Sequence, residues 1–164
     1  MSIAEFLSEF EREAATTRRV LERVPTDKLA WKPHDKSMSI GKLAMHIASG
    51  SGYISSWFVQ DVFNFAPNPT PEPASTEEIL AAHDASVAAV RQNLPKISDD
   101  SLNAAWSAKM GDKTLLAMPR GVAMRTLLAS HFYHHRGQLS VYLRLLDVKV
   151  PSIYGPSADE NPFG

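Results

Sequence analysis

The chain of 164 residues contains no cysteine. This absence excludes disulfide bonds, a thiolate nucleophile and thiolate metal ligands, so a soft divalent metal would have to be bound through nitrogen and oxygen atoms. It also fits a reducing compartment, and we expect a cytoplasmic protein. A single domain of this length buries about two-thirds of the surface that its unfolded chain exposes, so no crosslink is needed for folding alone.

An excess of charge of one sign is also absent, because 17 Lys and Arg stand against 18 Asp and Glu. Without a basic cluster, electrostatics gives no support for nucleic acid or an anionic membrane as a partner. No apolar run approaches the roughly 18 residues that would cross a membrane. Residues 1–20 are acidic and amphipathic, unlike a signal peptide. We therefore expect a soluble, unprocessed protein with no nucleic-acid partner.

Strand-like alternation is scarce, whereas apolar residues three or four positions apart recur in four segments. This period is typical of amphipathic helices. Ser75, with Glu78 three residues later, forms a capping-box signature at the start of the third segment, and Pro95 follows its end. The predicted helices comprise residues 3–24, 39–63, 75–94 and 122–146.

Two segments between these helices lack helical periodicity. Residues 65–76 carry a proline at every second position from 67 to 73, which predicts an extended spacer. Residues 98–121 are predicted to form a loop, with a short hairpin around 110–113. Four helices with two long connections predict an all-α four-helix bundle. We expect one domain over residues 1–164, with the turn-rich tail 145–164 packed on the bundle and anchored by Tyr154.

Three glycines lie inside the predicted helices. Gly50 and Gly52 lie in the second helix and Gly137 lies in the fourth. Each costs a helix about 1 kcal/mol relative to alanine. We expect that a neighbouring helix approaches closely at all three positions, which would explain why alanine is absent there.

The segment HFYHHRGQ, residues 131–138, contains three of the six histidines. Spacing places His131 and His135 one helical turn apart on a seam that continues through Gln138, Tyr142 and Leu145, the geometry in which two imidazoles share a metal. An unsatisfied buried imidazole costs roughly 1–3 kcal/mol, so a partner is expected. Hydrogen bonds between the two histidines, or to Gln138 or Tyr142, explain the pattern equally well.

A metal site needs a third ligand from a facing helix. The remaining histidines are His34 in a loop, His46 beside the seam of the second helix and His83 within the seam of the third. Spacing alone does not show whether His46 or His83 is the third ligand. Each of them, considered by itself, is more typical of a hydrogen-bonded core histidine. His134 lies off the seam.

Other motifs and prominent side chains have ordinary structural interpretations. The zinc-protease motif HEXXH is absent because Phe132 follows His131, and no phosphate-binding loop or nucleophile elbow is present. We expect Arg136 to be solvated or paired with a carboxylate. The three tryptophans are expected in the core rather than at a substrate platform.

Residues 31–48, 131–151 and 152–160 resemble, in this order, the signature segments of DinB-like proteins. The resemblance implies that one divalent metal per chain is held by His46, His131 and His135, with nickel or zinc preferred and iron or manganese as further options. It also implies an up-down-down-up order of the four helices, with long loops between helices two and three and between three and four, and a homodimer.

The same resemblance implies an enzyme with a small-molecule substrate. Three histidines leave a coordination position open, and relatives in the wider superfamily activate a low-molecular-weight thiol, so a metal-dependent thiol transferase or isomerase is the expected activity. The alternatives are a metal-dependent hydrolase and a non-enzymatic, stress-associated dimeric bundle with a structural metal. No carboxylate at helical spacing indicates a general base, and no catalytic residue is assigned.

Overall fold

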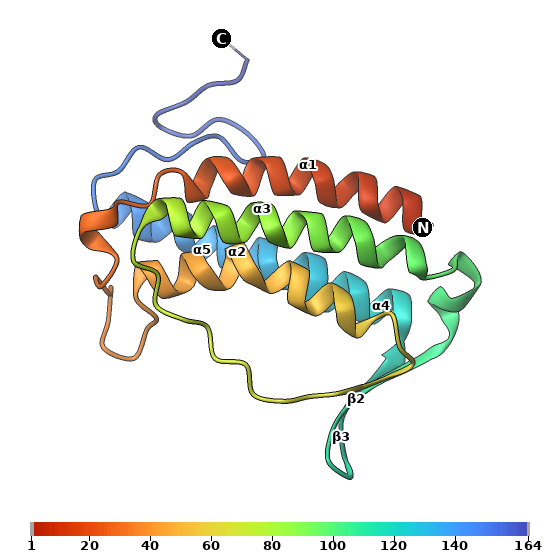
Figure 1. Cartoon of the computed structure of the whole chain (residues 1–164). Helices are drawn as coiled ribbons and strands as arrows, with labels where there is room; N and C mark the ends of the chain where they lie inside the picture. Colours follow the sequence, from red (N-terminus) through yellow and green to blue (C-terminus); the bar gives the residue numbers. More distant parts are fainter. Residues whose placement is uncertain (1, 164) are drawn as a thin grey trace.

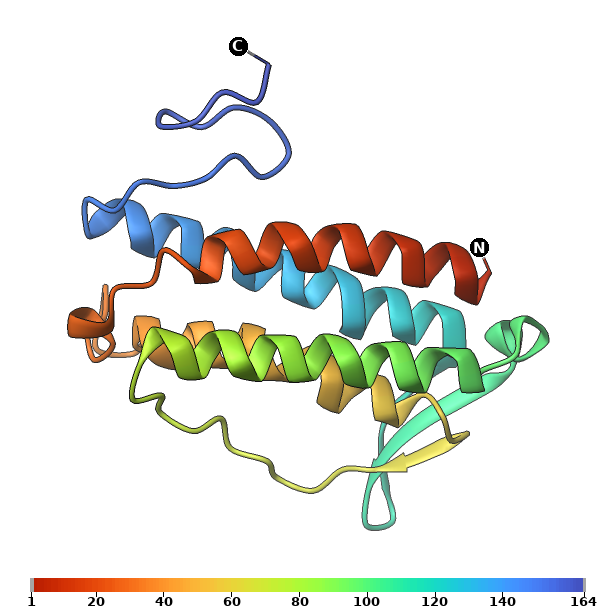
Figure 2. The ribbon, with the colours of Figure 1, turned by 45° about the horizontal axis from the view of Figure 1, so that its top comes forward.

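The computed structural model describes residues 2–163 and is mostly helical. Its long helices lie side by side as a bundle (Figures 1 and 2). The fourth helix is composite, because a π-helical segment, η4 (Arg125–Ser130), separates α4 (Arg120–Met124) from α5 (His131–Leu145). All four predicted helices are therefore confirmed. The other helices are α1 (Ile3–Leu21), α2 (Ile40–Trp57) and α3 (Thr76–Asn93), with short 3-10 helices η1 (Thr26–Lys28), η2 (Leu94–Lys96) and η3 (Asp99–Asn103).

Serine side chains cap the helix starts. The hydroxyl of Ser39 accepts a hydrogen bond from the Lys42 backbone N–H at the start of α2, and Ser75 accepts one from Glu78 at the start of α3. In the predicted capping box the Glu78 carboxylate accepts from the backbone N–H of Ala74 rather than from that of Ser75. These bonds satisfy backbone donors that a helix leaves free at its first turn.

The all-α prediction is incomplete, because the chain also forms a small sheet in the order β1-β2-β3. Strand β1 (Val62–Asn64) pairs in parallel with β2 (Ala105–Met110), which pairs antiparallel with β3 (Lys113–Pro119). The hairpin predicted around residues 110–113 is confirmed, with Gly111 at a positive φ of 59° in its turn. Much of the predicted loop 98–121 is thus ordered as strand, and the hairpin extends away from the bundle (Figure 1).

The predicted second helix was too long. It ends at Trp57, and residues 62–64 leave the helix to pair with β2. The buried guanidinium of Arg120 donates hydrogen bonds to the backbone carbonyls of Phe58 and Gln60 and pairs with Asp61. These contacts satisfy carbonyls that a helix end leaves free, and they join the end of α2 to the start of α4.

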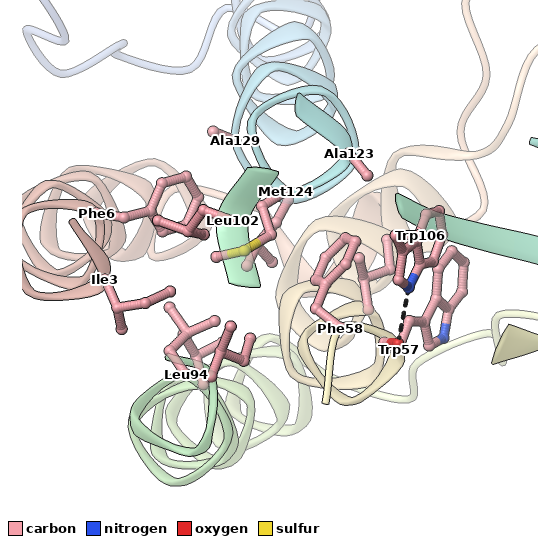
Figure 3. Packing of buried hydrophobic residues seen from close by; sticks show 14 of the residues in the cluster. Ile3, Phe6, Trp57, Phe58, Leu94, Leu102, Trp106, Ala123, Met124 and Ala129 are labelled. Carbon is pink, nitrogen blue, oxygen red and sulfur yellow. Dashed lines mark hydrogen bonds between the residues drawn. The ribbon is translucent and has the colours of Figure 1, made fainter. Parts of the chain in front are cut away.

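The core at this end of the bundle holds the sheet against the helices. Trp106 and Ala108 of β2 are buried, and the indole N–H of Trp106 donates to the carbonyl of Trp57 at 3.1 Å (Figure 3). Figure 3 also shows side chains of α1, α2 and α4 converging on this cluster, among them Phe6 and Met124. Trp57 and Trp106 are buried as expected, whereas Trp31 is half-buried. Trp57 also lines a pocket, so its expected exclusion from a binding surface is not confirmed.

Two of the three glycines are sites of close helix packing. A Cβ atom at Gly50 would lie 2.6 Å from the Phe132 ring, and one at Gly52 would lie 2.8 Å from the Ser86 Cα atom of α3. The same prediction for Gly137 was wrong, because no heavy atom lies within 4 Å of a Cβ there. That glycine faces open space on α5.

The segment 65–75, which joins β1 to α3, is here called the strap. It runs as an extended chain along the outside of the bundle, as the alternating prolines predicted, and returns to the end at which α2 begins (Figures 1 and 2). Helices α2 and α3 consequently run in the same direction. This connection places the strap beside the middle of α2.

The segment after α5 contacts the bundle through polar groups. The Tyr154 hydroxyl donates to Glu13 of α1 at 2.9 Å, and the buried guanidinium of Arg136 binds both Glu13 and Tyr154 at 2.6 Å. Arg136 is thus paired with a carboxylate, which is one of its two expected states. No helix within residues 2–163 combines the length and apolar character that a membrane crossing requires.

Candidate metal centre

Three histidines from two helices converge in the middle of the bundle. His46 lies near the centre of α2, and His131 and His135 are one turn apart at the start of α5. One ring nitrogen from each lies within 4.8 Å of the others. The Nε2 atoms of His46 and His131 are 3.1 Å apart. The structure therefore brings together the three histidines that the resemblance indicated.

The remaining histidines lie elsewhere. His83 is buried against α1, where its Nε2 atom is 3.1 Å from the carbonyl oxygen of Ala14, so it is a core histidine. His34 is exposed in the loop before α2, and its Nδ1 atom accepts from the backbone N–H of Lys36. His134 is exposed on α5. The tertiary structure thus shows that His46, and not His83, lies with His131 and His135, a choice that spacing alone did not allow.

The π-helical segment sets the direction in which α5 presents its histidines. A π turn holds an extra residue, so the buried stripe after η4 is shifted by one position relative to an uninterrupted helix. Phe132, Leu139 and Leu143 are buried, whereas the predicted seam members Gln138 and Leu145 are exposed. The predicted seam was therefore wrong beyond His135. Both α5 histidines lie half-buried at the margin of the stripe, where a ligand can reach them.

Hydrogen bonds orient two of the three imidazoles. The Nδ1 atom of His135 is 2.7 Å from the amide oxygen of Gln138 and donates to it. The Nδ1 atom of His46 is 3.5 Å from the hydroxyl of Thr70 in the strap. Because the Gln138 oxygen can only accept, it fixes the tautomer of His135 and leaves its Nε2 as the free ligand atom. A hydrogen bond from His135 to Gln138 was expected as an alternative to metal binding. The observed bond is compatible with metal binding, because it leaves Nε2 free.

Burial keeps the three imidazoles neutral. It lowers the pKa of His131 to about 4, with the nearby His135 and His46 rings adding to the effect. Burial is also the main cause of the lowered pKa of His46, followed by the charge of His135. For His135, burial lowers the pKa against the opposing hydrogen bond of Gln138. A neutral imidazole is the form that binds a metal, so the cluster is ready for ligation at neutral pH.

A pocket of about 440 Å³ adjoins the histidines. His46 and His131 form part of its wall, and the rest comes from α2, the strap and η4. Sequence patterns did not predict that the strap takes part, because its prolines indicated only an extended spacer. Side chains of this wall include Tyr53, Ile54, Trp57, Phe65, Asn68, Pro69, Thr70, Pro71 and Leu127.

The sequence model of the DinB family matches residues 1–161. The chain belongs to this family. It is similar to the uncharacterized protein YrdA of Bacillus subtilis (strain 168), with 30% identity over 156 residues that cover 94% of this chain and 89% of YrdA. The resemblance inferred from three short segments is thereby confirmed over nearly the whole chain.

Two solved structures share the fold. A DinB-like protein from Bacillus cereus ATCC 10987 has a TM-score of 0.74 at 23% identity, over 93% of this chain and 98% of that one. The DinB-like protein YjoA from Bacillus subtilis has a TM-score of 0.69 at 17% identity, over 91% of this chain and 97% of that one. At these identities the likeness concerns the fold.

Proposed function

We propose that His46, His131 and His135 bind one divalent metal ion, nickel or zinc before iron or manganese, and that the protein is a metal-dependent transferase or isomerase acting with a low-molecular-weight thiol. The observation that carries the proposal is the convergence of three ring nitrogens within 4.8 Å beside a pocket. The up-down-down-up helix order belongs to the same proposal, and the parallel course of α2 and α3 in Figure 1 supports it.

The donor set fits such an ion. Two imidazole nitrogens at about 2.1 Å from one tetrahedral ion lie roughly 3.4 Å apart. The 3.1 Å between Nε2 of His46 and Nε2 of His131 is close to that separation. Three nitrogen ligands suit zinc, nickel or iron, and the absence of cysteine leaves no thiolate to compete for the ion.

The chemistry that the ion supplies when bound is Lewis acidity at an open coordination position. Gln138 holds the ring of His135 in its orientation, and Thr70 lies beside Nδ1 of His46. Half-burial keeps protons off the ligand nitrogens, and the pocket gives a small molecule a place against His46 and His131. A structural site is closed by protein ligands, so the adjoining pocket favours an enzyme.

The pocket favours thiol chemistry over hydrolysis. Hydrolysis commonly uses a positioned carboxylate or a further base to move protons. Neither Asp nor Glu is among the described residues that line the pocket. The ion, when bound, would lower the pKa of a thiol that reaches it, so thiol chemistry would not require a carboxylate in the wall. The homodimer and the cytoplasmic location stay predictions.

Cobalt substitution tests access of a thiol to the site. Adding 2-mercaptoethanol to the Co²⁺-loaded protein should produce a near-ultraviolet thiolate-to-cobalt band that is absent from the Co²⁺-treated His135→Ala protein. The exposed His134→Ala variant is the matched control and should keep the band. A loaded wild-type spectrum that does not change with thiol would contradict the proposal.

A further inference from the structure

We infer that the pocket beside the three histidines receives a neutral, mainly apolar organic group, such as an aromatic ring system, carried by the substrate whose reactive end lies at His46 and His131. This inference deepens the proposed function and rests on it. The chemistry of the pocket wall indicates a substrate class, which the three histidines alone do not define.

The wall of the pocket is uncharged. No Lys, Arg, Asp or Glu is among the described residues that line the pocket. A carboxylate, phosphate or ammonium group placed there would lose hydration without gaining a counter-charge, which is strongly unfavourable. The body of the substrate within this pocket therefore carries no net charge.

The wall of the pocket is rich in aromatic rings. Tyr53 and Trp57, one turn apart on α2, meet edge to face with ring centroids 5.4 Å apart. Phe65 of the strap meets Trp57 at 6.1 Å with the ring planes 87° apart. Three aromatic rings with Ile54 and Leu127 offer an apolar surface to which flat, uncharged groups bind well.

Two hydroxyl groups of the wall already have polar partners. Ser49 donates its hydroxyl to the Met45 carbonyl at 2.8 Å. Thr70 lies against Nδ1 of His46. Beyond the histidines, the buried indole N–H of Trp57 has no hydrogen-bond partner among the described residues, and Asn68 also lines the wall. The site therefore matches a molecule with a reactive, polar end at the histidines and an apolar body that carries few, uncharged hydrogen-bonding groups.

The pocket has the size and shape of a small-molecule site. Small-molecule sites occupy roughly 300–1,000 Å³, and this pocket has about 440 Å³. Pro69 and Pro71 restrict the backbone of the strap, so this wall exists before a ligand arrives. Preformed walls lower the conformational entropy lost on binding. A group of one or two fused rings fits this volume.

Calorimetric titration of the full-length protein with 2-naphthol, neutral at pH 7, and with 2-naphthoate, the anion of matched shape, tests the inference. Chelator-treated protein is used first, so that no metal attracts the carboxylate. We expect one site per chain and a naphthol affinity at least about tenfold above that for naphthoate. Equal affinities, or no naphthol binding at millimolar concentration, would overturn the inference.

Two phenylalanines provide a matched pair of substitutions. Phe63 and Phe65 both contact Trp57, but only Phe65 is among the lining residues. Phe65→Ser should weaken naphthol binding about tenfold, and Phe63→Ser should change it by less than about threefold. Equal effects of the two substitutions in proteins with wild-type circular dichroism would overturn the inference.

A gain-of-function variant keeps the test decisive if Phe65→Ser folds poorly. Leu127 is half-buried in the same wall. Leu127→Lys places a cation there and should raise the naphthoate affinity about tenfold while lowering that for naphthol. An unchanged preference for naphthol would count against the assigned location.

The outcomes distinguish this inference from the proposed function. If the protein binds naphthol but takes up no metal, the metal proposal is overturned and the apolar pocket has no reactive centre. If the protein binds one metal and a thiol but shows no preference for the neutral probe, only the inferred substrate class is overturned.

Discussion

The Nε2 atoms of His46 and His131 lie 3.1 Å apart, although the two residues are 85 positions apart in the chain. Two helices, α2 and α5, supply them. Two neutral imidazoles at this separation either share one proton or share one cation. The nearby His135 ring favours the shared cation. Its Nδ1 atom is bound to Gln138, so its Nε2 atom is available as a third nitrogen ligand for the same ion.

Gln138 should tune metal affinity without touching the metal. Its amide oxygen accepts from Nδ1 of His135, and loss of such a partner typically weakens metal binding about 10–100-fold. Competition with a chelator of known affinity should show this loss for Gln138→Ala. Ser140→Ala is the control, because the Ser140 hydroxyl donates to the carbonyl of Gly137. Equal affinities of the two variants would show that Gln138 does not support the site.

His83 predicts a pH dependence of stability that is independent of the metal centre. Burial is the main cause of its lowered pKa, against an opposing hydrogen bond to Ala14. As pH falls below about 6.5, the unfolded chain binds a proton that the folded protein resists. The contribution of His83 to the free energy of unfolding should therefore fall with decreasing pH, by at most about 1.4 kcal/mol per unit, until its folded pKa is passed. The three clustered histidines, whose pKa values are also lowered, add to the decline in metal-free protein, so the effect of His83 is read from a substitution.

Urea unfolding of chelator-treated protein between pH 7 and pH 5 measures this dependence. His83→Gln keeps a donor for the Ala14 carbonyl and should make the decline shallower. His34→Gln removes an exposed histidine and should leave it unchanged. Parallel declines in the wild type and the His83→Gln protein would contradict the assignment.

Gly52 and Gly137 should respond in opposite directions to alanine. A methyl group at Gly52 meets the backbone of α3 at 2.8 Å, and overpacking of this kind costs about 1–3 kcal/mol. At Gly137 a methyl group meets open space, and alanine should add about 0.5–1 kcal/mol of stability through helix propensity. Denaturant midpoints of the two variants test the pair. A stabilising Gly52→Ala would show that α2 and α3 pack less closely.

The helices and part of the metal centre were predictable because both depend on local spacing. The 3.6-residue period placed all four helices, the capping signature of Ser75 marked the start of α3, and a spacing of four placed His131 beside His135. The choice of His46 over His83 needed the packing of α2 on α5, or the resemblance to a family. Spacing within one helix carries no information about which other helix faces it.

The sheet and the π-helical segment were not predictable in the same way. Strand β1 has three residues and pairs with β2 more than forty positions later, so its hydrogen bonds are long-range. In β2 the burial of Trp106 and Ala108 alternates with exposed or half-exposed neighbours, a weak signal in a short segment. The extra residue of η4 shifted the seam of α5 by one position, and no residue type marks a π turn.

The most direct test of the metal centre is the metal content of protein purified without an affinity tag, measured by inductively coupled plasma mass spectrometry. His46→Ala is compared with His34→Ala, which removes an exposed histidine outside the cluster. We predict about one divalent metal per chain in the wild type and in His34→Ala, and almost none in His46→Ala. No metal in any of the three after reconstitution with nickel or zinc, or equal metal in all three, would contradict the three-histidine site.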